Sequence, residues 1–137
     1  AVVADILAKE VDFFSIGTND LTQYVLAADR TSERVSYLFD GLDPAVLRLV
    51  RNVIDSGHRE GIEVAMCGEL AADPVATPIL VGLGLDEFSM NSPAIPRAKR
   101  ILRQWDTREA QSLAENAIHC ETPQEVEKLV KDWGQAN

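Results

Sequence analysis

Three short apolar segments alternate with longer segments of helical periodicity along the chain. The apolar segments cover residues 11–16, 62–66 and 86–90, and each is followed by a polar loop and a helical pattern. This alternation is typical of βαβ units, in which successive strands are parallel. Because the apolar segments are nearly continuous, we expect strands that are buried on both faces of a sheet covered by helices.

Capping residues mark the starts of several helices. Asp43 and Asp73 each precede a proline, so each can act as an N-cap with proline at the first helical position. Thr122 and Glu125 have the spacing of a capping box. Residues 1–9 have the pattern of the end of an earlier helix. In three segments apolar residues recur on one helical face: Val46, Leu47, Val50, Val53 and Ile54; Ala110, Leu113, Ala114 and Ile118; and Val126, Leu129, Val130 and Trp133.

Three β/α units form only part of a larger sheet. A closed eight-stranded β/α barrel needs roughly 250 residues, so the 137 residues of this chain would supply fewer than half of its strands. We therefore predict the α/β class and, within it, a partial (β/α)8 TIM barrel. Its unpaired edges would recruit a second copy of the chain or a missing N-terminal portion, and we expect a homodimer.

Composition and charge disfavour several classes of function. The chain is 46% apolar and 26% charged, which fits one domain over residues 1–137. A net charge of −9 disfavours binding to nucleic acid or to an anionic membrane. The sequence has neither a long apolar run nor a leader pattern, so we expect a cytoplasmic protein without a membrane partner. Cys67 and Cys120 lack metal-ligand spacing, and we expect free thiols.

Residues with useful chemistry follow the predicted strands. Functional groups gather at the C-terminal ends of the strands in parallel β/α folds. Asn19 offers an amide that can donate to phosphate or carboxylate, and Asp20 offers an oxygen ligand for Mg²⁺. Arg30 has a planar fork that matches phosphate oxygens. Cys67, beside Gly68, could exchange a proton with a substrate.

Each of these residues also has a purely structural interpretation. Asp20 could cap a helix in a capping box with Gln23. Asn19 could be a turn residue bonded to local backbone. Arg30 could be a solvated surface charge, and Cys67 a small buried hydrophobic residue. The residues alone leave both interpretations open.

Other polar residues are better explained by structure. His58 lies where a helix C-terminus favours a cation, and His119 lies between two terminal helices. A basic run shares its helix with apolar residues and fits a solvated helix face; it consists of Arg97, Lys99, Arg100 and Arg103.

The segment 14–24, which contains Gly-Thr-Asn-Asp, is followed by Ala28-Asp29-Arg30 and resembles the C-terminal domain of the enzyme I family of the sugar phosphotransferase system. Segments 66–71 and 84–90 have the order and spacing of that family, and the resemblance covers nearly the whole chain. Pyruvate phosphate dikinase and phosphoenolpyruvate synthase share some of these elements. Segments 37–40, 43–47 and 70–73 look more like enzyme I, with nitrogen-related paralogues as an alternative.

The resemblance implies a specific chemistry. It implies that Asn19 and Arg30 contact the phosphate of phosphoenolpyruvate, that Asp20 holds Mg²⁺, and that Cys67 is the acid/base that protonates enolpyruvate to pyruvate. The parent enzyme would pass the phosphate through its own histidine to a histidine-bearing phosphocarrier protein. Residues 1–137 would then be the last three β/α units and C-terminal helices of a phosphoenolpyruvate-binding barrel.

The resemblance also implies that the site is partial. The phosphorylated histidine, a second acidic Mg²⁺ ligand and other phosphate-binding arginines of the family lie on segments that precede the one resembled here. We therefore expect the isolated chain to be inactive. A different class of function is a non-catalytic oligomerisation module in which the loop motifs are caps and turns.

Overall fold

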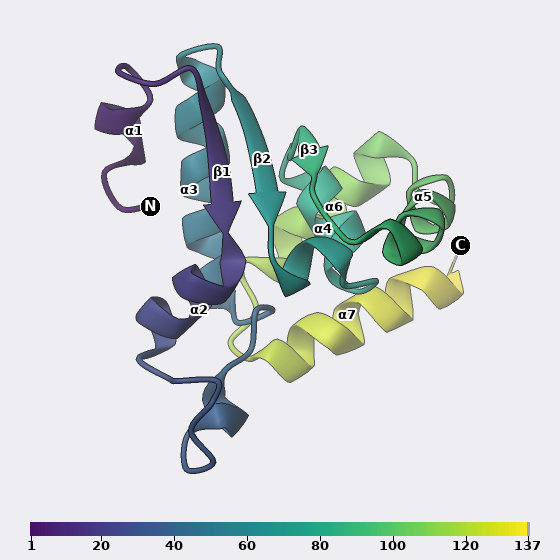
Figure 1. Cartoon of the computed structure of the whole chain (residues 1–137). Helices are drawn as coiled ribbons and strands as arrows, with labels where there is room; N and C mark the ends of the chain where they lie inside the picture. Colours follow the sequence, from purple (N-terminus) through teal and green to yellow (C-terminus); the bar gives the residue numbers. More distant parts are fainter. Residues whose placement is uncertain (137) are drawn as a thin grey trace.

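The computed structural model describes residues 1–136 and contains a parallel three-stranded sheet in the order β1-β2-β3 (Figure 1). The strands are β1 (Phe13–Gly17), β2 (Glu63–Cys67) and β3 (Glu87–Phe88). In the register, Gly17 lies beside Cys67, and Met66 lies beside Phe88. The predicted α/β class and parallel strand direction are confirmed. Each strand begins one or two residues later than predicted.

Seven α-helices and three short 3-10 helices connect and cover the described strands. The α-helices are α1 (Ala4–Leu7), α2 (Thr18–Leu26), α3 (Pro44–Arg59), α4 (Ala76–Gly82), α5 (Ile95–Leu102), α6 (Thr107–Ala117) and α7 (Pro123–Ala136). The 3-10 helices are η1 (Ser36–Leu38), η2 (Glu69–Ala72) and η3 (Ser92–Ala94). Within residues 1–136, no helix has both the length and the apolar character needed to cross a membrane.

The predicted helix caps are largely present. Asp43 accepts a hydrogen bond from the N–H of Ala45 at 2.8 Å and caps α3. Asp73 accepts from the N–H groups of two following residues, but regular helix begins only at Ala76 because Asp73 first closes a tight turn. The predicted capping box before α7 is half correct. Thr122 accepts from the Glu125 N–H, whereas the Glu125 carboxylate accepts from the preceding residue, Glu121.

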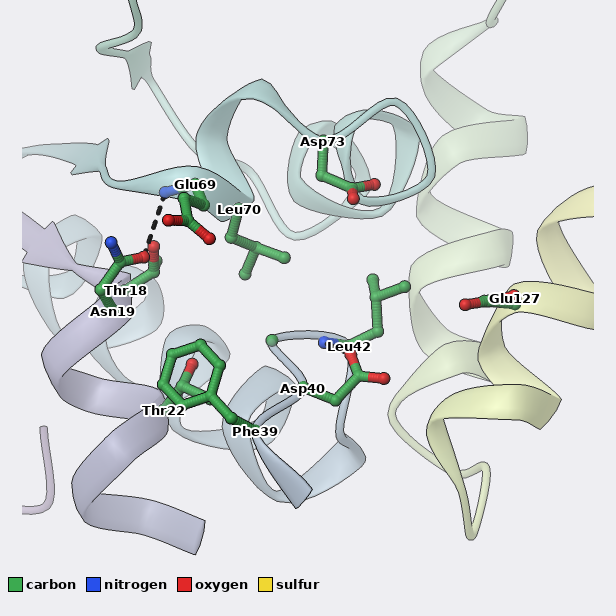
Figure 2. A pocket seen from close by; sticks show the side chains of 11 residues that line it. Thr18, Asn19, Thr22, Phe39, Asp40, Leu42, Glu69, Leu70, Asp73 and Glu127 are labelled. Carbon is green, nitrogen blue, oxygen red and sulfur yellow. Dashed lines mark hydrogen bonds between the residues drawn. The ribbon is translucent and has the colours of Figure 1, made fainter. Parts of the chain in front are cut away.

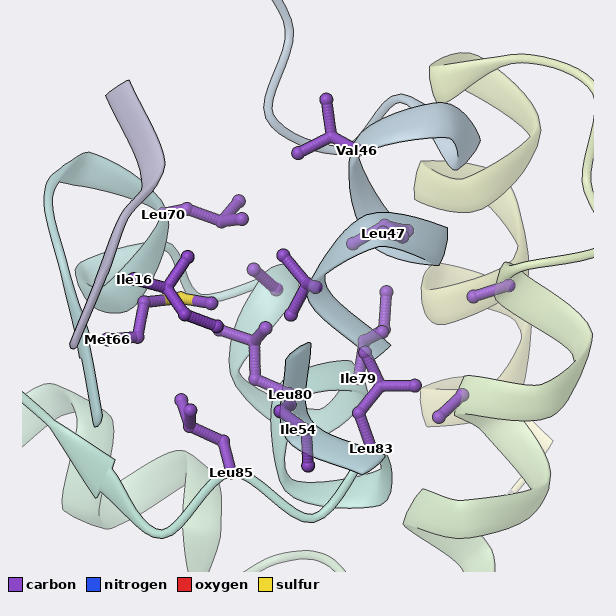
Figure 3. Packing of buried hydrophobic residues seen from close by; sticks show 14 of the residues in the cluster. Ile16, Val46, Leu47, Ile54, Met66, Leu70, Ile79, Leu80, Leu83 and Leu85 are labelled. Atoms are coloured by element: carbon purple, nitrogen blue, oxygen red, sulfur yellow. The ribbon is translucent and has the colours of Figure 1, made fainter. Parts of the chain in front are cut away.

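One hydrophobic core joins the sheet to its helices (Figure 3). Its fully buried side chains include Met66 of β2, Leu47 and Ile54 of α3, and Ile79 and Leu80 of α4. Burying each large apolar side chain contributes about 1.5–3 kcal/mol. The predicted apolar faces of α3, α6 and α7 all contribute to this core or pack against it. This core therefore holds the sheet against one layer of helices.

The opposite face of the sheet is uncovered in the described chain. In β1, Phe13 and Ser15 are exposed while Ile16 is buried. In β2, Glu63 is exposed while Val64 and Met66 are fully buried. The expectation that the strands are buried on both faces is therefore wrong for this chain. The nearly continuous apolar segments led to this wrong prediction. Small apolar residues on the open face, such as Ala65, extend the apolar segment although they are not fully buried.

Candidate functional site

The segments at the carboxyl ends of the three strands meet at one cavity of about 580 Å³. We call it the strand-end cavity. It is lined by Asn19, Cys67, Gly68, Glu69, Ala72, Asp73, Pro74, Ser89, Met90 and Asn91. Parallel pairing brings these segments together, because the carboxyl ends of all three strands lie on the same edge. The convergence expected from the sequence is present for Asn19 and Cys67.

Cys67 is the last residue of β2, is partly buried and lines the strand-end cavity. The Ser15 hydroxyl donates toward the Cys67 sulfur at 3.9 Å, and the Thr18 hydroxyl donates to the Cys67 carbonyl oxygen at 3.0 Å. The thiol therefore has one polar neighbour and an open side. This environment differs from that of a small hydrophobic residue sealed in the core.

Asn19 is the second residue of α2, and its carboxamide oxygen accepts a hydrogen bond from the backbone N–H of Glu69 at 3.1 Å (Figure 2). The interpretation of Asn19 as a turn residue bonded to nearby backbone is wrong, because its partner lies fifty positions away. With the oxygen engaged, the carboxamide nitrogen keeps both of its donors for another group. Asn19 can therefore present N–H donors to an anion at the strand ends.

Gly68 makes this arrangement possible. Its φ of +101° is a conformation that L side chains rarely adopt. A Cβ at this position would lie 2.5 Å from the Thr18 hydroxyl oxygen and 3.1 Å from the Asn19 carboxamide oxygen. Only glycine lets the start of α2 pack this closely against the end of β2.

Asp20 lies in the first turn of α2 and is exposed. The helix begins at Thr18 after Gly17, so Asp20 is inside the helix and the predicted capping box with Gln23 is wrong. Across residues 1–136, no hydrogen bond or ion pair engages its carboxylate, and no cluster of three or more His, Cys, Asp or Glu side chains forms a complete metal site. Asp20 can therefore supply one hard oxygen ligand of a shared cation site.

Arg30 follows α2 and donates from Nη1 to the Glu69 carboxylate at 3.4 Å. It is thus directed toward the Cys-Gly-Glu loop, and its side chain is still 47% exposed. Hydrogen bonds from the backbone and hydroxyl of Thr31 lower the pKa of the adjacent Asp29. Neither Asp20 nor Arg30 is among the residues that line the strand-end cavity.

A second cavity of about 320 Å³ (Figure 2) shares Asn19, Glu69 and Asp73 with the strand-end cavity. Its lining includes four acidic residues, Asp40, Glu69, Asp73 and Glu127. No lysine or arginine of the described chain lines it. The strand-end cavity has only two of these acidic residues, Glu69 and Asp73, and also contains Cys67, so it is the better candidate for a phosphate-bearing substrate.

Ser15, Thr18 and Glu69 were not predicted as individual site residues. Each contacts a predicted site residue: Ser15 and Thr18 contact Cys67, and Glu69 contacts both Asn19 and Arg30. The available signal was their position within two residues of Gly17 or Gly68. The contacts themselves depend on the register of β1 and β2, which the sequence does not give.

The chain is similar to known proteins over most of its length. The family model described as "PEP-utilising enzyme, PEP-binding domain" matches residues 1–107. Proteins named phosphoenolpyruvate-protein phosphotransferase are similar, at 56% identity over 133 residues in Staphylococcus carnosus and 53% over 134 residues in Latilactobacillus sakei. Each match covers 97% of this chain but only 23% of the relative. The chain therefore belongs to the family of PEP-utilising enzymes, matching the model of their PEP-binding domain.

Proposed function

We propose that this chain is the C-terminal segment of the phosphoenolpyruvate-binding domain of an enzyme I of the sugar phosphotransferase system. The parent would transfer phosphate from phosphoenolpyruvate to its own histidine and then to a histidine-bearing phosphocarrier protein. The observation that carries this proposal is the meeting of Asn19 and Cys67 at one cavity in a chain whose relatives have phosphotransferase names. Those names favour this function over a dikinase or a non-catalytic module.

Two residues of the chain are suited to the phosphate group. The carboxamide nitrogen of Asn19 keeps two donors because its oxygen is held by Glu69. Arg30 offers a permanently charged fork for phosphate oxygens and lies against the same loop. The strand-end cavity, at about 580 Å³, has room for a three-carbon phosphate ester.

Cys67 would manage the proton of the reaction. When the phosphorus–oxygen bond of phosphoenolpyruvate breaks and the phosphoryl group passes to a histidine nitrogen, enolpyruvate remains. Its terminal carbon takes the thiol proton of Cys67, which gives pyruvate and a thiolate. The Ser15 hydroxyl, 3.9 Å from the sulfur, is placed to donate to that thiolate. In the reverse direction the thiolate would remove the same proton.

Asp20 is the residue of this chain that would hold Mg²⁺. Its carboxylate is a hard oxygen donor without a competing partner among the described residues, which fits this ion. When bound, Mg²⁺ would neutralise negative charge on the substrate oxygens. The remaining ligands would come from other parts of the parent, since Asp20 lies in no acidic cluster within residues 1–136.

The uncovered face of the sheet supports a partial (β/α)8 barrel. Helices pack on one face, and the other face carries the Ser15 and Cys67 side chains. In a closed barrel that second face would point inward and the helices outward. Upstream β/α units of the parent would then extend the edges at β1 and β3. We also propose that the parent is a cytoplasmic homodimer and that the isolated segment is inactive.

The test uses a full-length parent that contains this segment. Cys67→Ala should abolish Mg²⁺-dependent pyruvate formation from phosphoenolpyruvate while the circular dichroism spectrum stays unchanged. Cys120→Ala is the matched control, because this second free thiol lies between α6 and α7. Unchanged turnover in the Cys67 variant would remove the acid/base role. A wild-type parent that neither binds nor converts phosphoenolpyruvate would overturn the proposed function.

A further inference from the structure

We propose that the Glu69 carboxylate is a built-in counter-anion that occupies Arg30 until the phosphate group of the substrate displaces it. The inference rests on the proposed function, because it assigns a competitor to the predicted phosphate-binding arginine. Glu69 would act as a positioning residue that sets substrate affinity. It would not touch the reacting atoms.

The first observation is that one residue contacts both predicted phosphate ligands. The backbone N–H of Glu69 donates to the Asn19 carboxamide oxygen at 3.1 Å, and its carboxylate accepts from Arg30 at 3.4 Å. The backbone contact fixes the loop and orients the amide. The side-chain contact places a negative charge where the guanidinium would otherwise meet an incoming anion.

The second observation is that the ion pair is exposed and easily exchanged. The side chains of Arg30 and Glu69 are 47% and 78% exposed. Solvent screens such a pair strongly, so a phosphate dianion that engages the planar fork through two oxygens can replace a single carboxylate contact. The Glu69 side chain can turn away into solvent without breaking the backbone bond to Asn19.

The third observation concerns the charges around the loop. Neither the strand-end cavity nor the acidic cavity beside it is lined by a lysine or arginine of the described chain. Arg30 does not line the strand-end cavity, but it contacts Glu69, which does. Arg30 is therefore a cation of this chain that lies next to the strand ends. Whatever engages Arg30 in the absence of substrate directly reduces the affinity for an anionic ligand.

Removing the negative charge of Glu69 should therefore strengthen the binding of an anion to Arg30. Glu69→Gln keeps the backbone N–H and nearly the same shape but removes the carboxylate charge. We expect the Kd of inorganic phosphate and the KM of phosphoenolpyruvate to fall twofold to fivefold, the range that corresponds to an exposed ion pair. The change should appear in KM, not as a rise in kcat.

The experiment compares four variants of the full-length parent by calorimetric titration with inorganic phosphate and by steady-state kinetics. Glu33→Gln is the matched control, because Glu33 is an exposed carboxylate in the loop that follows Arg30. It removes the same charge without touching the ion pair. Arg30→Gln combined with Glu69→Gln should bind phosphate no more tightly than Arg30→Gln alone, because the competitor has no target left.

Each result decides the inference. Tighter phosphate binding in Glu69→Gln but not in Glu33→Gln supports it. If Glu69→Gln binds phosphate with the same affinity as the wild type, the inference is overturned. Weaker binding in Glu69→Gln also overturns it, because Glu69 would then orient Arg30 for the substrate. If phosphate binds but phosphoenolpyruvate is not converted, the proposed function fails while the phosphate titrations still decide the role of Glu69. If the wild type binds neither ligand, both proposals fall.

Discussion

Asn19 and Glu69 are joined by a hydrogen bond of 3.1 Å although they are fifty positions apart in the chain. Beside it, the Thr18 hydroxyl donates to the Cys67 carbonyl oxygen at 3.0 Å. These two bonds flank Gly68 and tie the start of α2 to the end of β2. The predicted anion-binding amide and the predicted acid/base thiol are therefore held in one rigid unit.

Gly68→Ala should disrupt this unit. The new Cβ would meet the Thr18 hydroxyl oxygen at 2.5 Å and would adopt a disfavoured φ. Backbone strain of this kind costs about 1–3 kcal/mol, and each lost hydrogen bond costs about 0.5–1.5 kcal/mol more. We expect a lower free energy of unfolding in urea and a higher KM for phosphoenolpyruvate in the full-length parent.

Gly61→Ala is the matched control for that variant. Gly61 also has a positive φ, of +73°, but an added Cβ would meet no atom within 4 Å. It should lose stability through backbone strain alone, about 1–2 kcal/mol, and leave the KM for phosphoenolpyruvate unchanged. Equal effects of both alanines on KM would show that the contacts of Gly68 do not matter for the site.

Asn19→Asp tests the donor role of the carboxamide nitrogen. The aspartate can still accept from the Glu69 N–H, so the link between the strand ends should survive. It loses both N–H donors and adds a negative charge beside the expected phosphate. The loss of one charge-assisted hydrogen bond, about 1.5–3 kcal/mol, should raise the KM for phosphoenolpyruvate about tenfold to a hundredfold.

The control is Asn116→Asp, because Asn116 is an exposed asparagine of α6 whose amide serves only the Ser112 carbonyl oxygen among the described contacts. Its KM should match that of the wild type. If Asn19→Asp also kept the wild-type KM, the phosphate would have to be held by other residues.

Local signals predicted most helices and the parallel direction of the strands. The Asp43 cap of α3 depends on neighbours two residues away, and the apolar face of α3 depends on helical spacing, so both could be predicted from the sequence. The contact between His58 and Asp86 shows what local sequence signals cannot predict. His58 was correctly placed at a helix end, but its partner depends on where β3 begins beside α3.

The candidate site was predictable in composition but not in geometry. Asn19 and Cys67 could be placed at one edge of the sheet, because parallel strands have their carboxyl ends together. The role of Asp20 as a capping residue was wrong because the helix begins two residues earlier, at Thr18. The pairing of Arg30 with Glu69 could not be predicted, since it joins side chains 39 positions apart on two irregular segments.

Asp86 should make the stability of the chain depend on acid pH. Burial raises its pKa, but hydrogen bonds from the Val64 N–H and His58, each 2.8 Å long, outweigh burial and hold the pKa below the ordinary value. A carboxyl with a lowered folded pKa stabilises the fold above its unfolded pKa, near 3.9. That stabilisation is lost as pH falls through the folded pKa.

Urea denaturation of the wild type from pH 7 to pH 2 should therefore show a falling free energy of unfolding below about pH 4. Asp86→Asn should lower stability at pH 7 and flatten this dependence. Asp12→Asn is the control, because Asp12 is exposed and its side chain has no ion-pair or hydrogen-bond partner within residues 1–136. An unchanged profile in Asp86→Asn would show that other carboxyl groups cause the acid sensitivity.

Two glycine-to-alanine changes should shift stability in opposite directions. Gly82 ends α4 where it packs on α6, and a Cβ there would overlap the Ala110 carbonyl group and lie 2.8 Å from the Ala114 Cβ. Gly82→Ala should therefore force the two helices apart and cost about 1–3 kcal/mol. In Gly134→Ala, at an exposed position of α7, the Cβ would meet no atom within 4 Å.

Because alanine favours helix over glycine by about 0.8–1.0 kcal/mol, Gly134→Ala should raise the free energy of unfolding that Gly82→Ala lowers. Urea denaturation followed by circular dichroism at 222 nm measures both. A Gly82→Ala chain as stable as the wild type would mean that α4 and α6 can separate at no cost. The close packing of these two helices would then contribute little to the core that supports the sheet.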